Sequence, residues 1–392
     1  MKKRTMRTAR WMMAGTLVLV AAACGSSSKP AAAPTTTVAA AATTATTAAP
    51  SATTAAPGTT TAAATGDTTA PIGTAVGAAN GATTTCGANT STLPMPAVPA
   101  SGAGITLAVN PWTGSAVNAN VAKYILETKL NTPTKLLAID ENATWQGLDK
   151  GDIDAVLEVW PSGHAADYTT YVTQKKSVTC IGLLGPDAKI GWYIPTFMLK
   201  DHPDLATWEG FKDPKNAKLF ATAETGDLGQ FLMGDPSYVS YDEQIIKNLD
   251  LPLKFVVAGS EAAEITAIQT AIKDQTPLLM QFWQPHWLQS KVALTQVKLP
   301  DVTPACLASA AANDGKYACD YPVDHLYKAA SVKLQDKNPA AFAFLQRMQL
   351  TTDQQNEISA LIDGNGTNGM TPDAAAKQWV DANPDIVASW LK

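Results

Sequence analysis

Short apolar runs and helix-like segments alternate along the chain from about residue 100 onward. Residues 104–110, 135–139 and 153–159 are apolar runs of the length of a buried strand. Residues 115–130, between the first two runs, carry apolar side chains at helical spacing. Strands that alternate with helices in this way are typical of parallel βαβ units, so the pattern predicts an α/β fold.

The alternation continues through the rest of the chain. Further strands are predicted at residues 178–184, 190–195, 218–222, 255–258 and 278–282, and further helices at 242–249, 261–273, 340–348, 352–362 and 374–382. The strand at 190–195 leads the chain into a second lobe, from which it later returns. We expect lobe 1 to comprise residues 103–196 and 293–392, and lobe 2 residues 197–292. Two crossings between lobes predict a hinge and a ligand cleft.

The first 24 residues predict an export signal. Five basic residues lie within the first ten, and an apolar run of about 13 residues follows, too short to stay as a membrane-spanning helix. Cys24 follows three alanines and precedes Gly25 and Ser26. This resembles a bacterial lipobox and predicts a lipoprotein held on the outer face of the cytoplasmic membrane, with ordinary signal cleavage as the alternative.

Residues 25–100 are rich in Ala and Thr and show neither helical nor strand periodicity. Such a segment cannot bury enough apolar area to offset the entropy of ordering it. We expect a disordered tether that holds the folded part near the membrane.

Four cysteines remain after the signal, an even number in a chain predicted to be exported. They allow three pairings. The short loop between Cys306 and Cys319 favours a bond between these two, with Cys86 joined to Cys180. Four free thiols are the alternative.

The charge of the mature chain argues against several classes of partner. Without the five basic residues of the signal, 24 lysines and arginines face 34 acidic residues, which gives a net charge near −10. This disfavours nucleic acid and anionic lipid, so we expect contact with the membrane through the lipid anchor only. Arg347 is the one arginine after the signal, which disfavours capture of phosphates or dicarboxylates by an arginine fork.

Sequence motifs of common enzyme classes are missing. The chain has no Gly-x-Ser-x-Gly elbow, no Walker loop and no His-Glu-x-x-His motif, and its four histidines lack metal-ligand spacing. We therefore expect a binding protein rather than an enzyme, with no cofactor and no metal.

Three tryptophans lie at the ends of predicted strands. Trp112, Trp160 and Trp283 each follow an apolar run within two residues. In open parallel sheets, ligands bind outside the carboxyl ends of the strands. Several aromatic faces with almost no arginine suit a quaternary ammonium ion, which binds by cation–π contact. Packing in a core is the alternative for each tryptophan taken alone.

Five motifs in the folded part point to a known family. They are VNPWTGS at residues 109–115, DENATWQG at 140–147, GDIDAVLEVWPSGH at 151–164, KIGWYIP at 189–195 and FWQPHW at 282–287. Together they resemble the glycine betaine/proline betaine substrate-binding proteins of ABC importers, over residues 103–392. The resemblance implies a type II periplasmic-binding-protein fold, a monomer whose two α/β lobes close on ligand, and a permease and an ATPase as partners.

The resemblance also implies roles for individual residues. In that family an aromatic box holds the trimethylammonium group, and a histidine and backbone amides hold the carboxylate. Trp160 and His164 match the motif of the first lobe, and Trp283 and His286 match that of the second. Tyr238 stands where some members carry a tryptophan.

The start of the first predicted helix completes the expected site. Trp112 stands where other members place an aromatic residue or carboxylate-binding amides. Free N–H groups of Gly114 and Ser115 at a helix start would suit a carboxylate. For His164 and His286, a hydrogen bond to a local backbone carbonyl is the alternative role.

The leading hypothesis is a protein that binds glycine betaine or a related osmolyte and delivers it to an ABC permease. A choline or carnitine binder is the alternative within this class. A sensor or adhesion module that does not transport its ligand, and an enzyme that acts on choline-like compounds, are alternatives from other classes.

Overall fold

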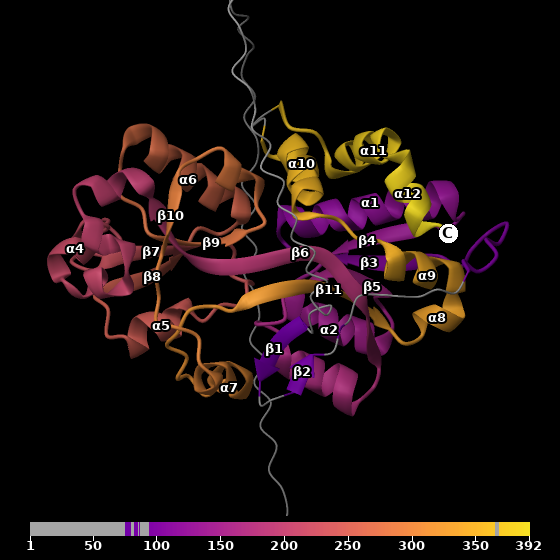
Figure 1. Ribbon diagram of the computed structural model, residues 1–392, viewed down its shortest axis with the longest axis horizontal. Helices are drawn as coiled ribbons and strands as arrows, with labels where there is room; N and C mark the ends of the chain where they lie inside the picture. Colours follow the sequence, from indigo (N-terminus) through magenta and orange to yellow (C-terminus); the bar gives the residue numbers. More distant parts are fainter. Residues whose placement is uncertain (1–74, 80–81, 85, 87–93, 365–367) are drawn as a thin grey trace, which may run out of the picture. The chain divides into compact units, whose positions relative to one another are not determined.

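The computed structural model describes residues 75–79, 82–84, 86, 94–364 and 368–392 (Figure 1). The predicted signal, Cys24 and most of the predicted tether lie outside these residues. Strands β1 (Ala75–Ala79) and β2 (Ala82–Thr84) pair antiparallel within the stretch predicted to be a tether, where no strand was expected. Cys86 next to this segment is buried and bonded to Cys180.

One mixed sheet runs through the rest of the described chain. Its strands lie in the order β4-β3-β5-β11-β6-β9-β7-β8, and β10 pairs with β6 at the side. The strands are β3 (Ile105–Val109), β4 (Thr134–Ala138), β5 (Ala155–Val159), β6 (Val178–Pro195), β7 (Gly229–Met233), β8 (Leu253–Val257), β9 (Met280–Gln284), β10 (Leu294–Val297) and β11 (Val323–Ser331). The pairs β3/β4, β3/β5, β7/β8 and β7/β9 are parallel, whereas β6 and β11 run antiparallel to their neighbours. Two parallel βαβ groups are thus joined through two long antiparallel strands.

Helices cover both faces of the sheet. They are α1 (Thr113–Lys129), α2 (Glu141–Lys150), α3 (Ala165–Asp167), α4 (Pro214–Lys218), α5 (Asp242–Asn248), α6 (Glu261–Asp274), α7 (Pro304–Ala312), α8 (Leu334–Lys337), α9 (Pro339–Arg347), α10 (Thr352–Ile362), α11 (Pro372–Ala382) and α12 (Pro384–Trp390). Figure 1 shows α1, α10 and α11 on one side of the β3–β5 region and α2 on the other. Local sequence fixes several helix starts: Ser260 caps α6, and Thr351 with Gln354 forms a capping box on α10.

The core of the described chain is divided into four clusters. Two of them flank β3, β5 and β11, one under α1, α9, α10 and α11 and the other under α2. A third cluster surrounds β7, β8 and the end of β6, and a fourth contains Trp112, Trp160 and Trp283. Residues from the 294–321 region, assigned to lobe 1 by the sequence analysis, pack in the third cluster together with Phe231.

Several strand predictions were wrong in detail. Residues 218–222 form the end of α4 and a turn, and the strand of this region is instead β7. The two runs at 178–184 and 190–195 are one strand, β6, because β11 pairs along it past the Gly-Pro step at 185–186. Neither β10 nor β11 was predicted from the sequence.

The four cysteines are joined in the favoured pairing. Cys86 is bonded to Cys180 of β6, and Cys306 of α7 is bonded to Cys319. The Cα atoms of the two pairs are 5.6 and 6.3 Å apart, within the range usual for disulfides. Within the described ranges, we find no helix with the length and apolar character needed to cross a bilayer.

Candidate functional site

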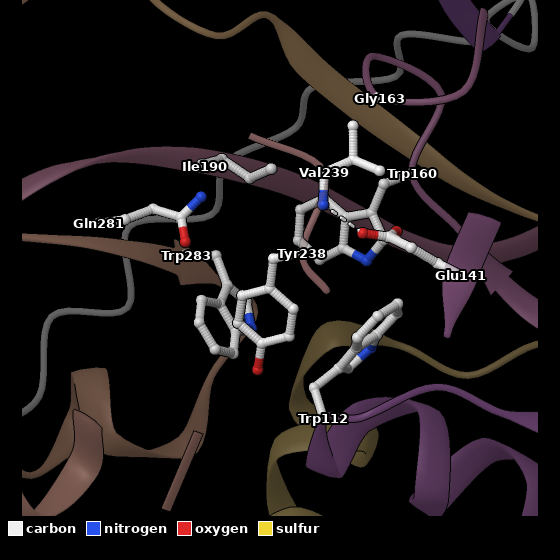
Figure 2. Close-up of a pocket in the computed structure, with 9 residues that line it drawn as sticks. All are labelled: Trp112, Glu141, Trp160, Gly163, Ile190, Tyr238, Val239, Gln281 and Trp283. Carbon is white, nitrogen blue, oxygen red and sulfur yellow. Dashed lines mark hydrogen bonds between the residues drawn. The ribbon is translucent and has the colours of Figure 1, made fainter. Parts of the chain in front are cut away.

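Four aromatic side chains converge on one pocket (Figure 2). They are Trp112, Trp160, Tyr238 and Trp283, and the pocket is also lined by Glu141, Gly163, Ile190, Val239 and Gln281. The three tryptophans are each 7 or 8 % exposed, so most of their surface is already covered by protein. The structure therefore brings together the four aromatic residues that the sequence analysis singled out.

These rings come from four separate places in the chain. Trp112 is the N-cap residue of α1, where φ of −143° and ψ of 155° keep it extended after Pro111. Trp160 directly follows β5, as expected. Trp283 lies inside β9 and is paired with Ile190, not after the end of its strand as expected.

Tyr238 is held by a turn that its own sequence favours. The Asp235 carboxylate accepts hydrogen bonds from the backbone N–H and the hydroxyl of Ser237, at 2.9 and 2.7 Å. The Tyr238 hydroxyl donates to the carbonyl of Pro111, 3.2 Å away. Burial raises the pKa of Tyr238 far above its usual value, with added repulsion from Glu261, so the ring is neutral.

The rings meet edge to face. The centroids of Trp112 and Tyr238 are 6.0 Å apart at an interplanar angle of 74°, and those of Tyr238 and Trp283 are 5.6 Å apart at 87°. Ring edges are electropositive and ring faces electronegative. Edge-to-face contacts turn neighbouring faces in different directions around one space, an arrangement that suits a compact cation.

A buried carboxylate lies behind two of the tryptophans. Oε1 of Glu158, on β5, accepts hydrogen bonds from Nε1 of Trp112 at 2.7 Å and of Trp160 at 3.1 Å. Glu158 had no role predicted from the sequence. Its signal was visible, because a charged residue in the middle of the apolar run Ala155–Val159 needs a buried partner.

The pocket also contains a carboxylate that the sequence analysis missed. Glu141, the first residue of α2, accepts a hydrogen bond from the backbone N–H of Val239 (Figure 2). Its other oxygen is 2.8 Å from Nε2 of His164. Glu141 is the one charged side chain among the residues that line this pocket.

His164 lies behind Glu141 and does not line the pocket. It is buried, and its Nδ1 is 3.0 Å from a carboxylate oxygen of Asp167. Burial by itself lowers the pKa of His164, but the carboxylates of Glu141 and Asp167 outweigh it and raise the pKa to about 9. The raised pKa favours an ion pair between His164 and Glu141 at neutral pH, whereas the Nε1–H of Trp145, 3.1 Å from Nδ1 of His164, favours the neutral ring.

His286 does not line the pocket either. Its Nε2 is 3.1 Å from Oε1 of Glu261, and its Nδ1 accepts the backbone N–H of Leu288. Oε2 of Glu261 accepts hydrogen bonds from the backbone N–H and the hydroxyl of Thr113, at 2.8 and 2.7 Å. Glu261, at the start of α6, thus bridges His286 to the first turn of α1.

Gly114 and Ser115 are not among the residues that line the pocket. The Ser115 hydroxyl accepts the backbone N–H of Asn110, and a Cβ at Gly114 would lie 2.5 Å from the Gln355 amide and 2.9 Å from Glu158. Gly114 is therefore required for close packing over Glu158.

Among the described residues, no group of three or more His, Cys, Asp or Glu side chains is arranged to hold a metal ion.

A mixed sheet of this order, with an aromatic pocket beside its central strands, defines a ligand-binding protein of the type II periplasmic-binding-protein fold. The chain belongs to the OpuAC family, the substrate-binding domain of ABC-type glycine betaine transport systems, whose family model matches residues 103–382. The sequence resemblance to this family is thereby confirmed. It is a family of transport proteins, not of enzymes.

Individual relatives bind related small molecules. The trimethylamine N-oxide-binding protein of Pelagibacter ubique is 26 % identical over 297 residues, which cover 74 % of this chain and 90 % of the relative. Lactococcal OpuAC complexed with glycine betaine has a TM-score of 0.58 at 21 % identity, over 74 % of this chain and 100 % of that one. An ABC-transporter choline-binding protein complexed with choline has a TM-score of 0.58 at 18 % identity, over 73 % and 91 %. At these identities the two solved structures show the fold.

Proposed function

We propose that this chain binds a small quaternary ammonium compound, or a close chemical relative, in the aromatic pocket and delivers it to an ABC permease. The convergence of Trp112, Trp160, Tyr238 and Trp283 on one space carries the proposal. Each desolvated face is worth about 2 kcal/mol toward a cation, so three or four faces support roughly micromolar affinity after the cost of association.

We propose that the pocket lies between two lobes that close on the ligand. From the sequence, lobe 1 was expected to comprise residues 103–196 and 293–392, and lobe 2 residues 197–292. The packing of residues from the 294–321 region with Phe231 supports moving that segment to lobe 2. Trp112 and Trp160 then belong to lobe 1, and Tyr238 and Trp283 to lobe 2, so lobe closure completes the site.

The surroundings of the pocket favour a ligand without a carboxylate, such as choline. Glu141 would repel a carboxylate, and neither His164 nor His286 lines the pocket. The backbone N–H groups of Val239 and Gly163 already donate within the protein, to Glu141 and to the carbonyl of Trp160. Glycine betaine remains the candidate that the family description favours.

The place of action follows from the family and the predicted anchor. Substrate-binding proteins of this family are extracytoplasmic. We propose that Cys24 carries a lipid, that the protein acts as a tethered monomer, and that a permease and an ATPase are its partners. A sensor that binds the same ligand without transport is the alternative.

Calorimetric titration with glycine betaine, proline betaine, carnitine, choline, trimethylamine N-oxide and ectoine tests the proposal. We expect at least one trimethylated compound to bind at micromolar concentration, with choline or trimethylamine N-oxide tighter than glycine betaine if Glu141 repels carboxylates. If none binds below millimolar concentration, the assignment of the pocket is wrong. Uptake of the bound compound is then compared between cells with and without this protein. A transport role predicts lower uptake in the cells that lack it, whereas a sensing role predicts equal uptake.

A further inference from the structure

Glu158 connects Trp112, the N-cap residue of α1, to Trp160, which follows β5, through a single oxygen atom. The side chain is 3 % exposed, and its Oε1 accepts both indole N–H groups, from Trp112 at 2.7 Å and from Trp160 at 3.1 Å. These two residues are otherwise 48 positions apart in the sequence. Their ring orientations therefore depend on one common acceptor.

The second oxygen of Glu158 is occupied as well. Oε2 accepts Nδ2 of Asn118 at 2.6 Å and Nε2 of Gln355 at 2.9 Å, from α1 and α10. All four partners are N–H donors, so they fit an ionised carboxylate, which only accepts hydrogen bonds. A protonated Glu158 would place its own hydrogen against one of these donors and lose that bond.

We propose that Glu158 is a positioning residue of the pocket that also supplies charge: its carboxylate sets the planes of Trp112 and Trp160 and makes the site prefer a permanent cation over a neutral molecule of the same shape. This inference rests on the proposed function and deepens it. No contact between Glu158 and the ligand is required, since Glu158 acts through the two indole rings and through its charge.

Two physical effects support this role. An indole that donates its N–H to an anion becomes more electron-rich, so its face attracts a cation more strongly. A charge that is buried away from water also acts over several ångströms with little screening. Neither effect stabilises an uncharged ligand. A merely structural Glu158, present to satisfy two buried indole N–H groups, would affect both kinds of ligand equally.

The charge of Glu158 is expected to depend on pH near neutrality. Burial raises its pKa to about 7, against the lowering effect of Trp112, Trp160 and Gln355. The negative charge of Glu261, on α6, also contributes to this raised pKa. Two other titratable groups lie next to Glu261. His286 is paired with it, and Asp363, at the end of α10, contacts the same residue, Thr113, that Glu261 contacts. A fall in pH from 8 to 6 would therefore remove negative charge from behind the rings.

Glu158→Gln is a closely matched test, because Gln keeps one oxygen to accept both indoles. Among the described residues, Oδ1 of Asn118 and Oε1 of Gln355 have no hydrogen-bond partner. Either amide can turn its oxygen toward the new Nε2, so the network can re-form without the charge. Glu127→Gln, on the outer face of α1, removes an equal charge far from the pocket and serves as the control.

The binding of choline, tetramethylammonium and the neutral choline isostere 3,3-dimethylbutan-1-ol is measured for each protein by calorimetry or competition at pH 6 and pH 8. We expect Glu158→Gln to weaken both cations on the order of tenfold and the isostere less than twofold. The wild type should also bind cations more weakly at pH 6, a dependence that the variant lacks. Equal weakening of cations and isostere, or unchanged cation affinity, would overturn the inference.

A second measurement keeps the inference separate from the proposed function. The indole N–H resonances of wild-type protein without ligand are followed by NMR from pH 5 to pH 9 and assigned with Trp112→Phe and Trp160→Phe. We expect both signals to shift together with one midpoint near 7. If no cation binds the wild type, the proposed function fails, while this titration still decides whether Glu158 is a common charged acceptor. A shift in only one of the two signals, or two different midpoints, overturns the common charged acceptor even if Glu158→Gln does not fold.

Discussion

The hydroxyl of Tyr238 donates a hydrogen bond to the carbonyl of Pro111, 3.2 Å away and 127 residues earlier in the chain. This bond joins the loop after β7 to the residue before Trp112. Tyr238 also meets Trp112 and Trp283 edge to face, so the Tyr238 ring connects these two tryptophans across the pocket.

Tyr238→Phe keeps the ring and removes only this bond. We expect it to weaken ligand binding by about 0.5–1.5 kcal/mol, the usual net contribution of one hydrogen bond. Tyr238→Ala should weaken binding more, because it also removes a face of the pocket. Calorimetry on both variants checks this order, and equal losses would mean that the hydroxyl matters more than the ring.

Trp283→Ala and Trp160→Ala should each weaken binding of the best ligand by about 1–3 kcal/mol, through loss of one cation–π face and its buried area. We expect both variants to fold. Trp208→Ala is the control, since Trp208 is half-buried under Lys212, in another cluster, and should leave affinity unchanged. A collapse of the melting temperature in both pocket variants would instead identify these tryptophans as core residues.

Glu141→Gln should change the choice of ligand. The substitution removes the one charged group that lines the pocket. It keeps one oxygen, which can accept from Val239 or from His164 but not from both, because the two contacts use different oxygens of Glu141. We expect affinity for choline to fall and affinity for glycine betaine to rise, each by a few-fold, because a nearby negative charge attracts one ligand and repels the carboxylate of the other. Changes of the same sign for both ligands, measured by calorimetry, would contradict this assignment.

The ion pair of His164 should make stability depend on pH in the alkaline range. The pKa of His164 is raised from 6.5 to about 9, so its stabilising contribution is complete below about pH 6.5 and is lost as pH rises through 9. We expect the difference in unfolding free energy between wild type and His164→Gln to shrink by on the order of 2–3 kcal/mol between pH 6 and pH 10. A difference that stays constant with pH would show that His164 is neutral in the folded protein.

The disulfide between Cys306 and Cys319 should stabilise the protein without affecting the site. The two residues are 13 positions apart, and closing a loop of that length in the unfolded chain is worth about 3 kcal/mol. We expect the double variant Cys306→Ser, Cys319→Ser to melt at a lower temperature and to bind ligand with unchanged affinity below its melting transition. A loss of affinity at full folding would place this loop in the binding mechanism.

Local sequence was sufficient for much of the fold. The periods of strands and helices predicted β3, β5, α1 and α10 closely, and the 190–195 run marked the end of β6. The strand β11 was not predicted, because it begins with Val323-Asp324-His325, which is typical of a loop. Its place in the sheet depends on pairing with β5 and β6, which are distant in the sequence.

The sequence by itself determined the class of protein and four aromatic residues of the pocket, because strand ends and family motifs are local signals. Only the tertiary structure decided what surrounds those rings. His164 and His286, each close in sequence to a pocket tryptophan, pair instead with Glu141 and Glu261, 23 and 25 residues away. Glu158 reaches Trp112 across 46 residues. Such partners are selected by the cost of leaving a buried charge or N–H unpaired, and that cost is set by packing among distant segments rather than by periodicity.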